Sequence, residues 1–156
     1  MKEKLTIVKV GGAVVEDELQ LSQLLKDFSA IEGRKVLVHG GGRKATKMAE
    51  RLGIETKMVE GRRITDADML EVVTMVYAGL VNKRLVSQLQ ALGVNAIGLC
   101  GADGALVRSH KRPPVNGIDY GFVGDVDGVN ADLLASLLSS GFVPVVSPLT
   151  YDGKGS

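Results

Sequence analysis

The chain of 156 residues has the length of a single domain, and 45% hydrophobic with 24% charged residues is typical of a globular protein with a sizeable core. Lysine and arginine, 19 in all, nearly balance the 18 acidic residues, so no overall field favours nucleic acid or a membrane surface as a partner. A single cysteine, Cys100, excludes an internal disulfide and a multi-cysteine metal site. No apolar run approaches the roughly 20 residues that span a bilayer. We expect a cytoplasmic protein.

Short β-branched runs alternate with segments of helical period, which predicts an α/β fold with a mostly parallel sheet covered on both faces. The predicted strands lie near 4–10, 35–39, 56–60, 94–99, 104–108, 120–124 and 142–147. The predicted helices run over 17–31, over 42–52 and, as the longest, from a Thr65 cap to Leu92, with a further helix starting at Asn130.

The long helix is apolar on more than one face in its first half. Leu70, Val73 and Tyr77 form one stripe, and Val72 and Met75 widen it beyond a single seam. One sheet cannot cover all of this surface, so we predict a homodimer through helix 66–92. The alternative is a helix wedged between the sheet and a covering loop.

Two glycine clusters follow predicted strands: Lys9-Val10-Gly11-Gly12 and His39-Gly40-Gly41-Gly42. Glycine turns at the carboxyl ends of parallel strands let backbone N–H groups approach an anion, and a helix N-terminus adds its dipole. Two such turns border the same cleft if their strands are neighbours. Lys9, at the mouth of this cleft, is placed to offset charge on a phosphoryl group. The alternative is an ordinary lysine at a strand end beside tight turns.

A rival interpretation uses the second cluster alone. The segment 40–45 fits G-x-G-x-x-A between a strand and a helix, and Glu60 could complete a dinucleotide-binding fingerprint. Against it, this pattern normally opens the first βαβ unit, and it leaves Lys9 and its glycines without a task. No G-x-x-x-x-G-K-[ST] pattern occurs.

Other polar residues have both a functional and an ordinary interpretation. One of the adjacent Arg62 and Arg63 can point into the cleft and bind a carboxylate, or both can be solvated loop residues. His39 ends a buried strand, where a histidine more often orients backbone than transfers protons. Asp125-x-Asp127 resembles a metal pair only superficially, and we predict turn and helix-cap chemistry there and no protein metal ligands.

Together, the Lys9–Gly12, Val38–Gly42 and Gly61–Asp66 segments resemble, in this order and spacing, the amino acid kinase family, and within it the acetylglutamate kinases. The Asn82-Lys83 pair and the segments 98–104 and 141–147 extend the resemblance over almost the whole chain. It implies an open three-layer αβα sandwich. It also implies phosphoryl transfer from MgATP to the γ-carboxylate of N-acetyl-L-glutamate, the second step of arginine biosynthesis.

The resemblance also implies roles for particular residues. Lys9 would stabilise the transferring phosphoryl group, and Gly11 and Gly12 would contact the phosphates of ATP, whose Mg²⁺ is held by the nucleotide. Gly41 and Gly42 would bind the substrate through backbone amides. Arg63 would clamp its α-carboxylate, because the family motif places its arginine two residues after the glycine.

Family members continue well beyond the length of this chain with a nucleotide-binding half. We therefore expect residues 1–156 to be the amino-terminal substrate-binding domain, without the carboxy-terminal half and inactive alone. Two alternatives stay open: a kinase acting on N-succinylglutamate, and a non-catalytic carboxylate-binding or regulatory module with the same sheet.

Overall fold

The computed structural model describes residues 4–156, and its centre is a four-stranded parallel sheet. The strands follow the order β1 (Leu5–Val10), β2 (Arg34–His39), β8 (Val143–Val146) and β5 (Ala96–Leu99). All three pairings are parallel, as the alternation of β-branched and helical segments predicts. β1 and β2 are neighbours, so the two glycine clusters lie side by side at one edge of the sheet.

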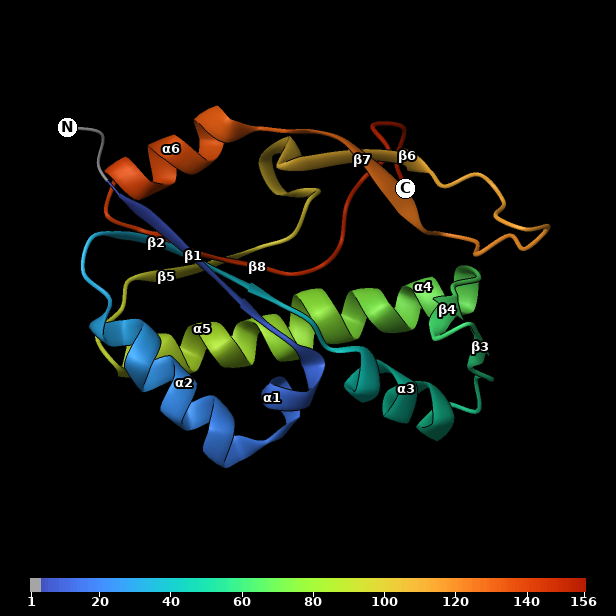
Figure 1. The fold of residues 1–156 in the computed structure, drawn as a ribbon, viewed down its shortest axis with the longest axis horizontal. Coiled ribbons are helices and arrows are strands. Elements are labelled where there is room, and N and C mark those ends of the chain that lie inside the picture. Colours follow the sequence, from blue (N-terminus) through green and yellow to red (C-terminus); the bar gives the residue numbers. More distant parts are fainter. Residues whose placement is uncertain (1–3) are drawn as a thin grey trace.

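Helices cover both faces of this sheet and make a three-layer αβα sandwich (Figure 1). One face carries α6 (Ala131–Ser139). The other helices lie on the opposite side: α1 (Gly12–Glu16), α2 (Glu18–Ala30), α3 (Gly42–Arg51), α4 (Ala67–Val73) and α5 (Asn82–Ala91). Within the described residues, no helix is long and apolar enough to cross a membrane.

The main core lies between the sheet and the layer formed by α1 to α5. Its largest fully buried side chains include Phe28, Leu25, Leu37, Leu85 and Leu89. Lys35 closes the end of α2, because its buried ammonium donates to the carbonyls of Phe28, Ser29 and Ile31 at 2.7–3.0 Å. A cation at a helix C-terminus satisfies carbonyls that have no partner within the helix and interacts favourably with the helix dipole.

The predicted long helix is continuous, but its start and its middle differ from the prediction. Its N-cap is Asp66, whose carboxylate accepts from Met69 N, so the prediction of a Thr65 cap is wrong. Thr65 is occupied elsewhere, because its backbone bonds to Tyr120 and Phe122. Between α4 and α5 the chain forms a π-helix, η1 (Thr74–Val81). Such i→i+5 segments are rare and occur frequently at functional sites.

Two hairpins extend from the sandwich. β3 (Lys57–Val59) and β4 (Arg62–Ile64) pair antiparallel through a turn with positive φ at both Glu60 and Gly61. The prediction placed the strand at 56–60 and treated Arg62 and Arg63 as loop, so β4 was missed. The second hairpin joins β6 (Val107–Lys111) to β7 (Gly124–Val129).

Both strands of that second hairpin were predicted too early in the chain, at 104–108 and 120–124, and this prediction is wrong. The short 3₁₀ turn η2 (Asp103–Ala105), with positive φ at Gly104 and Ala105, delays β6. Residues 112–123 connect the two strands and form the hairpin's tip.

Candidate active site

The two glycine turns touch each other at the carboxyl ends of β1 and β2. Gly40 N donates to Val10 O at 2.9 Å across the strand pair. A Cβ at Gly40 would lie 3.3 Å from Gly12 N, and one at Gly12 would lie 3.4 Å from Gly42 N. The approach at Gly40 is tighter than a side chain normally allows, and a Cβ at Gly12 would be in van der Waals contact, so glycine at position 40 lets the two turns lie against each other.

Each turn opens a helix without a side-chain cap. Gly11 is the N-cap of α1 and Gly41 the N-cap of α3, and neither position supplies an oxygen to the first turn. The first N–H groups of a helix have no partner inside it, and here they stay available for another acceptor. The arrangement suits an anion held by backbone amides.

Arg63 connects this surface to the rest of the site. Its Nη2 donates to Gly42 O at 2.7 Å and to Thr46 Oγ1 at 2.6 Å, and its Nη1 donates to Tyr77 Oη at 3.0 Å. Its Nε is buried and has no partner among the described residues. Arg62, in contrast, is exposed. Of the two adjacent arginines, the structure brings Arg63 to the glycine turn.

A cavity of about 570 Å³ lies beside Arg63. Its walls are partly apolar and include three arginines. The lining residues are Arg62, Arg63, Thr65, Leu70, Val73, Tyr77, Arg112, Tyr120, Phe122, Val123, Gly124, Pro148, Leu149 and Thr150. A mostly apolar hollow with a few convergent polar groups is the usual form of a small-molecule site.

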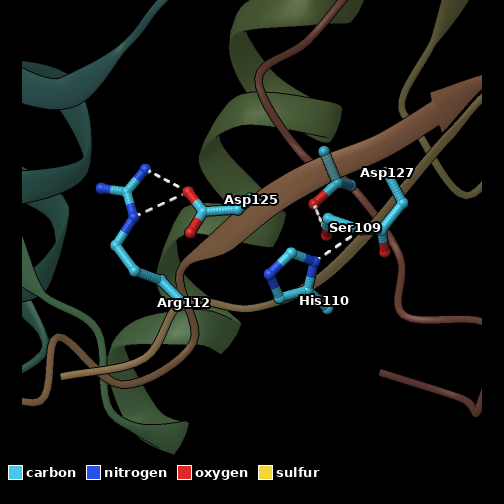
Figure 2. Close-up of polar contacts among 6 residues, drawn as sticks. Ser109, His110, Arg112, Asp125 and Asp127 are labelled. Atoms are coloured by element: carbon cyan, nitrogen blue, oxygen red, sulfur yellow. Dashed lines mark hydrogen bonds and ion pairs between the residues drawn. The ribbon is translucent and has the colours of Figure 1, made fainter.

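Arg112 enters this cavity from the hairpin already paired. Its Nε and Nη2 both donate to Asp125 Oδ1, at 2.8 and 2.7 Å (Figure 2). The hydrogen bonds from Arg112 lower the pKa of the Asp125 carboxyl, and the same contact raises the pKa of the guanidinium. Arg112 therefore brings a charge that is largely balanced.

The prediction of turn chemistry at Asp125-x-Asp127 is wrong, because both residues lie in β7, where their side chains bond to Arg112 and His110. Asp127 Oδ1 lies 2.6 Å from His110 Nδ1, and a dashed line marks this contact in Figure 2. The cap predicted at Asn130 is confirmed, since its side chain accepts from Leu133 N at the start of α6.

Lys9 lies near the end of β1 with its side chain exposed. Because side chains alternate along a strand, Lys9 shares a face with the exposed Leu5 and Ile7, whereas Val10 points into the core. The turns at Gly11–Gly12 and Gly40–Gly42 form one edge of the sheet, called the glycine edge below. Lys9 therefore borders this edge from the sheet face that carries α6, while Arg63 reaches it from the face covered by α1 to α5.

Beneath the second glycine turn lies a buried polar network that the sequence did not predict. Asn82 Nδ2 donates to His39 Nε2 and to Val145 O, both at 3.0 Å, and Asn82 Oδ1 accepts from Lys83 Nζ. His39 Nδ1 lies 2.9 Å from Gly40 O, in agreement with a backbone-orienting histidine. Burial, and then the charge of Lys83, lower the pKa of His39, so the ring is neutral at neutral pH.

Tyr77 and Asn82 are the site residues that sequence reasoning missed. Tyr77 was assigned to an apolar stripe, yet its hydroxyl meets Arg63. The signal for Asn82 was a polar residue in an otherwise apolar stretch of helix, followed directly by Lys83. Buried polar groups need hydrogen-bond partners, and such a residue indicates a network even where its partners are unknown.

A parallel sheet with side-chain-free turns at the carboxyl ends of adjacent strands defines an open α/β protein with its ligand crevice at that edge. Residues 4–156 match the model of the Amino acid kinase family, and the chain belongs to that family.

The chain is similar to proteins named acetylglutamate kinase. It is 69% identical over 156 residues to one from Phocaeicola vulgatus, covering 100% of this chain and 60% of the relative. It is 47% identical over 153 residues to one from Methanopyrus kandleri, covering 96% of this chain and 59% of the relative. The chain thus spans about 60% of the length of these relatives.

Solved structures agree on the fold. The structure of smu.665 from Streptococcus mutans has a TM-score of 0.78 at 26% identity, covering 97% of this chain and 61% of that one. N-acetylglutamate synthase from Neisseria gonorrhoeae, complexed with coenzyme A and N-acetyl-glutamate, has a TM-score of 0.80 at 22% identity, covering 97% and 35%. The second likeness concerns the fold alone.

Proposed function

We propose that this chain provides the acceptor side of a kinase that transfers a phosphoryl group from MgATP to the γ-carboxylate of N-acetyl-L-glutamate. This reaction is the second step of arginine biosynthesis, a cytoplasmic process. The observation that carries the proposal is the 2.7 Å bond from Arg63 Nη2 to Gly42 O beside the cavity. The relatives named acetylglutamate kinase support the choice of substrate.

On the acceptor side, Arg63 binds the α-carboxylate of the substrate. A guanidinium matches a carboxylate geometrically, and Arg63 Nη1, which donates one hydrogen bond to Tyr77, carries a second N–H. The backbone N–H groups of Gly41 and Gly42, at the start of α3, bind the substrate where the helix dipole favours negative charge. The apolar part of the cavity wall receives the acyl group.

On the donor side, Gly11 and Gly12 contact the phosphates of ATP, and Lys9 offsets the charge that develops on the transferring group. The close approach of Gly12 to Gly42 leaves a cradle that a side chain would fill, which fits a phosphate chain lying against the acceptor. ATP supplies the phosphoryl group, and its phosphates hold the Mg²⁺. In such transfers the protein contributes mainly positioning and electrostatic stabilisation.

We further propose that residues 1–156 form the amino-terminal, substrate-binding part of a longer kinase. The support is that the chain covers about 60% of relatives of that name. On its own the chain then turns over little or no ATP. Robust ATP turnover that depends on N-acetylglutamate, measured with the purified chain, would contradict this part of the proposal.

Calorimetric titration with N-acetylglutamate tests the acceptor site. Arg63→Ala is expected to lower affinity by about a hundredfold, since hydrogen bonds to a charged group are lost together with the charge. Arg51→Ala is the matched control, because Arg51 is an exposed arginine that does not line the cavity, and its effect should be severalfold at most. If Arg63→Ala bound N-acetylglutamate with unchanged affinity, Arg63 would not be the residue that holds its α-carboxylate. Binding of NAD(H) in place of N-acetylglutamate would favour the dinucleotide interpretation.

N-succinylglutamate is the second candidate substrate, because Arg62 and Arg112 also line the cavity and a succinyl group carries an additional carboxylate. The pairing of Arg112 with Asp125 favours the neutral acetyl group as first candidate. Titrations with both compounds and with free glutamate rank the acyl groups. A non-catalytic carboxylate-binding module would bind these compounds, yet a longer protein carrying this chain would show no ATP turnover.

We also propose a homodimer through helix 66–92. Met75 and Leu80 on η1 are 54% and 45% exposed, and a Cβ at Gly79 would meet nothing within 4 Å, so this face is open to a second copy. Sedimentation equilibrium should show a dimer at micromolar concentration. Met75→Glu is expected to shift it to monomer, and a wild-type monomer would exclude the dimer.

A further inference from the structure

We infer that Tyr77 is a substrate-binding residue that donates its phenolic proton to the carboxylate held by Arg63. This inference rests on the proposed function and adds to it a neutral donor beside the arginine. The observation behind it is the position of the Tyr77 hydroxyl, which accepts from Arg63 Nη1 at 3.0 Å on the wall of the cavity.

The phenol has a proton to give. A tyrosine hydroxyl carries one donor and can accept at the same time, and Arg63 can only donate. Arg63 therefore occupies a lone pair of Oη and leaves the proton for another acceptor. A carboxylate that lies against Arg63 brings oxygens next to this hydroxyl, and a hydrogen bond to a charged acceptor is stronger than one to a neutral acceptor.

The backbone around Tyr77 is arranged to bring the ring to the glycine turn. Tyr77 lies in the π-helix η1, and a Cβ at Gly41 would lie 3.0 Å from its Cδ1. Its hydroxyl lies 3.9 Å from the position of a Cβ at Gly42. One side of the ring thus packs on the acceptor turn while its hydroxyl meets the clamp, so Tyr77 touches both parts of the acceptor site.

Tyr77→Phe tests the inference, because it keeps the ring on Gly41 and removes only the hydroxyl. Affinity for N-acetylglutamate should fall about ten- to a hundredfold, the loss of a hydrogen bond to a charged group. For an analogue with an α-carboxamide in place of the α-carboxylate, Tyr77→Phe should lower the affinity severalfold at most. Binding of N-acetylglutamate with wild-type affinity would overturn the inference.

Thr46→Val is the matched control, since Thr46 also bonds Arg63 but through the other side of the guanidinium. If Tyr77 only held Arg63 in place, both variants would lose similar affinity and would not distinguish carboxylate from carboxamide, which also overturns the inference. A wild-type protein that does not bind N-acetylglutamate at all contradicts the proposed function itself.

NMR of the wild-type protein tests the same inference without depending on whether a variant folds. With ¹³Cζ-labelled tyrosine, three resonances are expected, and that of Tyr77 should move when N-acetylglutamate is added, because Cζ reports the hydrogen bonds of the phenol. A Tyr77 resonance that stays in place at saturating ligand would overturn the inference.

Discussion

The glycine edge of the sheet and the β6–β7 hairpin both gather polar side chains, but they use them differently. In the hairpin, His110 faces Asp127 and Lys111 faces Asp119, in pairs that are largely exposed. At the glycine edge, Arg63 keeps a buried Nε that has no partner within residues 4–156, and the first N–H groups of α3 have no side-chain cap there.

This difference separates a candidate site from a surface that only resembles one. Ser109, His110 and Asp127 are residue types found in hydrolases, yet Ser109 Oγ bonds Thr150 while His110 Nδ1 meets Asp127 (Figure 2). A nucleophile needs its base within hydrogen-bond reach, and here each group is engaged with another partner. Unsatisfied donors beside a cavity are the stronger sign of ligand binding.

The largest effect on stability is expected beneath the glycine edge. Asn82→Ala leaves His39 Nε2 and Val145 O buried without their donor, which should lower the free energy of unfolding by about 3 kcal/mol. Urea denaturation followed by circular dichroism measures it. Asn130→Ala, which removes an exposed helix cap, should cost about 1 kcal/mol. Equal costs would show that the network beneath the turn is not a special feature of this edge.

A smaller effect distinguishes glycines in the two regions. Gly41→Ala puts a Cβ 3.0 Å from Tyr77 Cδ1, so the ring must shift, at a cost of about 1–2 kcal/mol. Gly128→Ala, in β7, meets nothing within 4 Å and should change stability by no more than about 0.5 kcal/mol. Combining Gly41→Ala with Tyr77→Leu should cost less than the sum of the single changes, because the clash is gone. Additive costs would mean that the ring and the turn are not in contact.

The central sheet was predictable because each of its strands is an apolar, often β-branched run closed by glycine or by turn residues. The hairpins were placed less well. The β3–β4 turn depends on positive φ at Glu60, and the start of β6 depends on positive φ at Ala105 in the preceding η2 turn, and neither residue type is a typical turn residue. Propensity is a local signal, and here tertiary packing determined where the hairpin strands begin and end.

The part of the candidate site that depends on glycine turns and a motif arginine was predictable from the sequence. Gly41, Gly42 and Arg63 come together as the motif spacing implies. Tyr77 was assigned to an apolar stripe of the long helix, because helical periodicity assumes i→i+4 bonding. The residue lies in a π-helix, whose i→i+5 register composition does not encode, and its hydroxyl meets Arg63.

The two regions should also respond to pH in separate windows. Burial lowers the pKa of His39 from 6.5, so the unfolded chain takes up a proton that the folded chain resists, and stability falls as pH drops below about 6.5. In the hairpin, hydrogen bonds lower the pKa of Asp119 and Asp125 from 3.8, and the stability they contribute is lost only below that value. His39→Gln should flatten the slope of unfolding free energy between pH 6.5 and 5. If the slope were unchanged, another titrating group would cause this pH dependence.

The smallest effect is expected in the hairpin itself. Asp127→Asn weakens a pair whose side chains are 59% and 43% exposed, and exposed pairs contribute at most about 1 kcal/mol because water and salt screen them. Urea denaturation measures this cost, and N-acetylglutamate should bind as it does to the wild type. A large loss of ligand affinity would instead bring the hairpin into the site, and the distinction between paired surface groups and unsatisfied donors would fail for this protein.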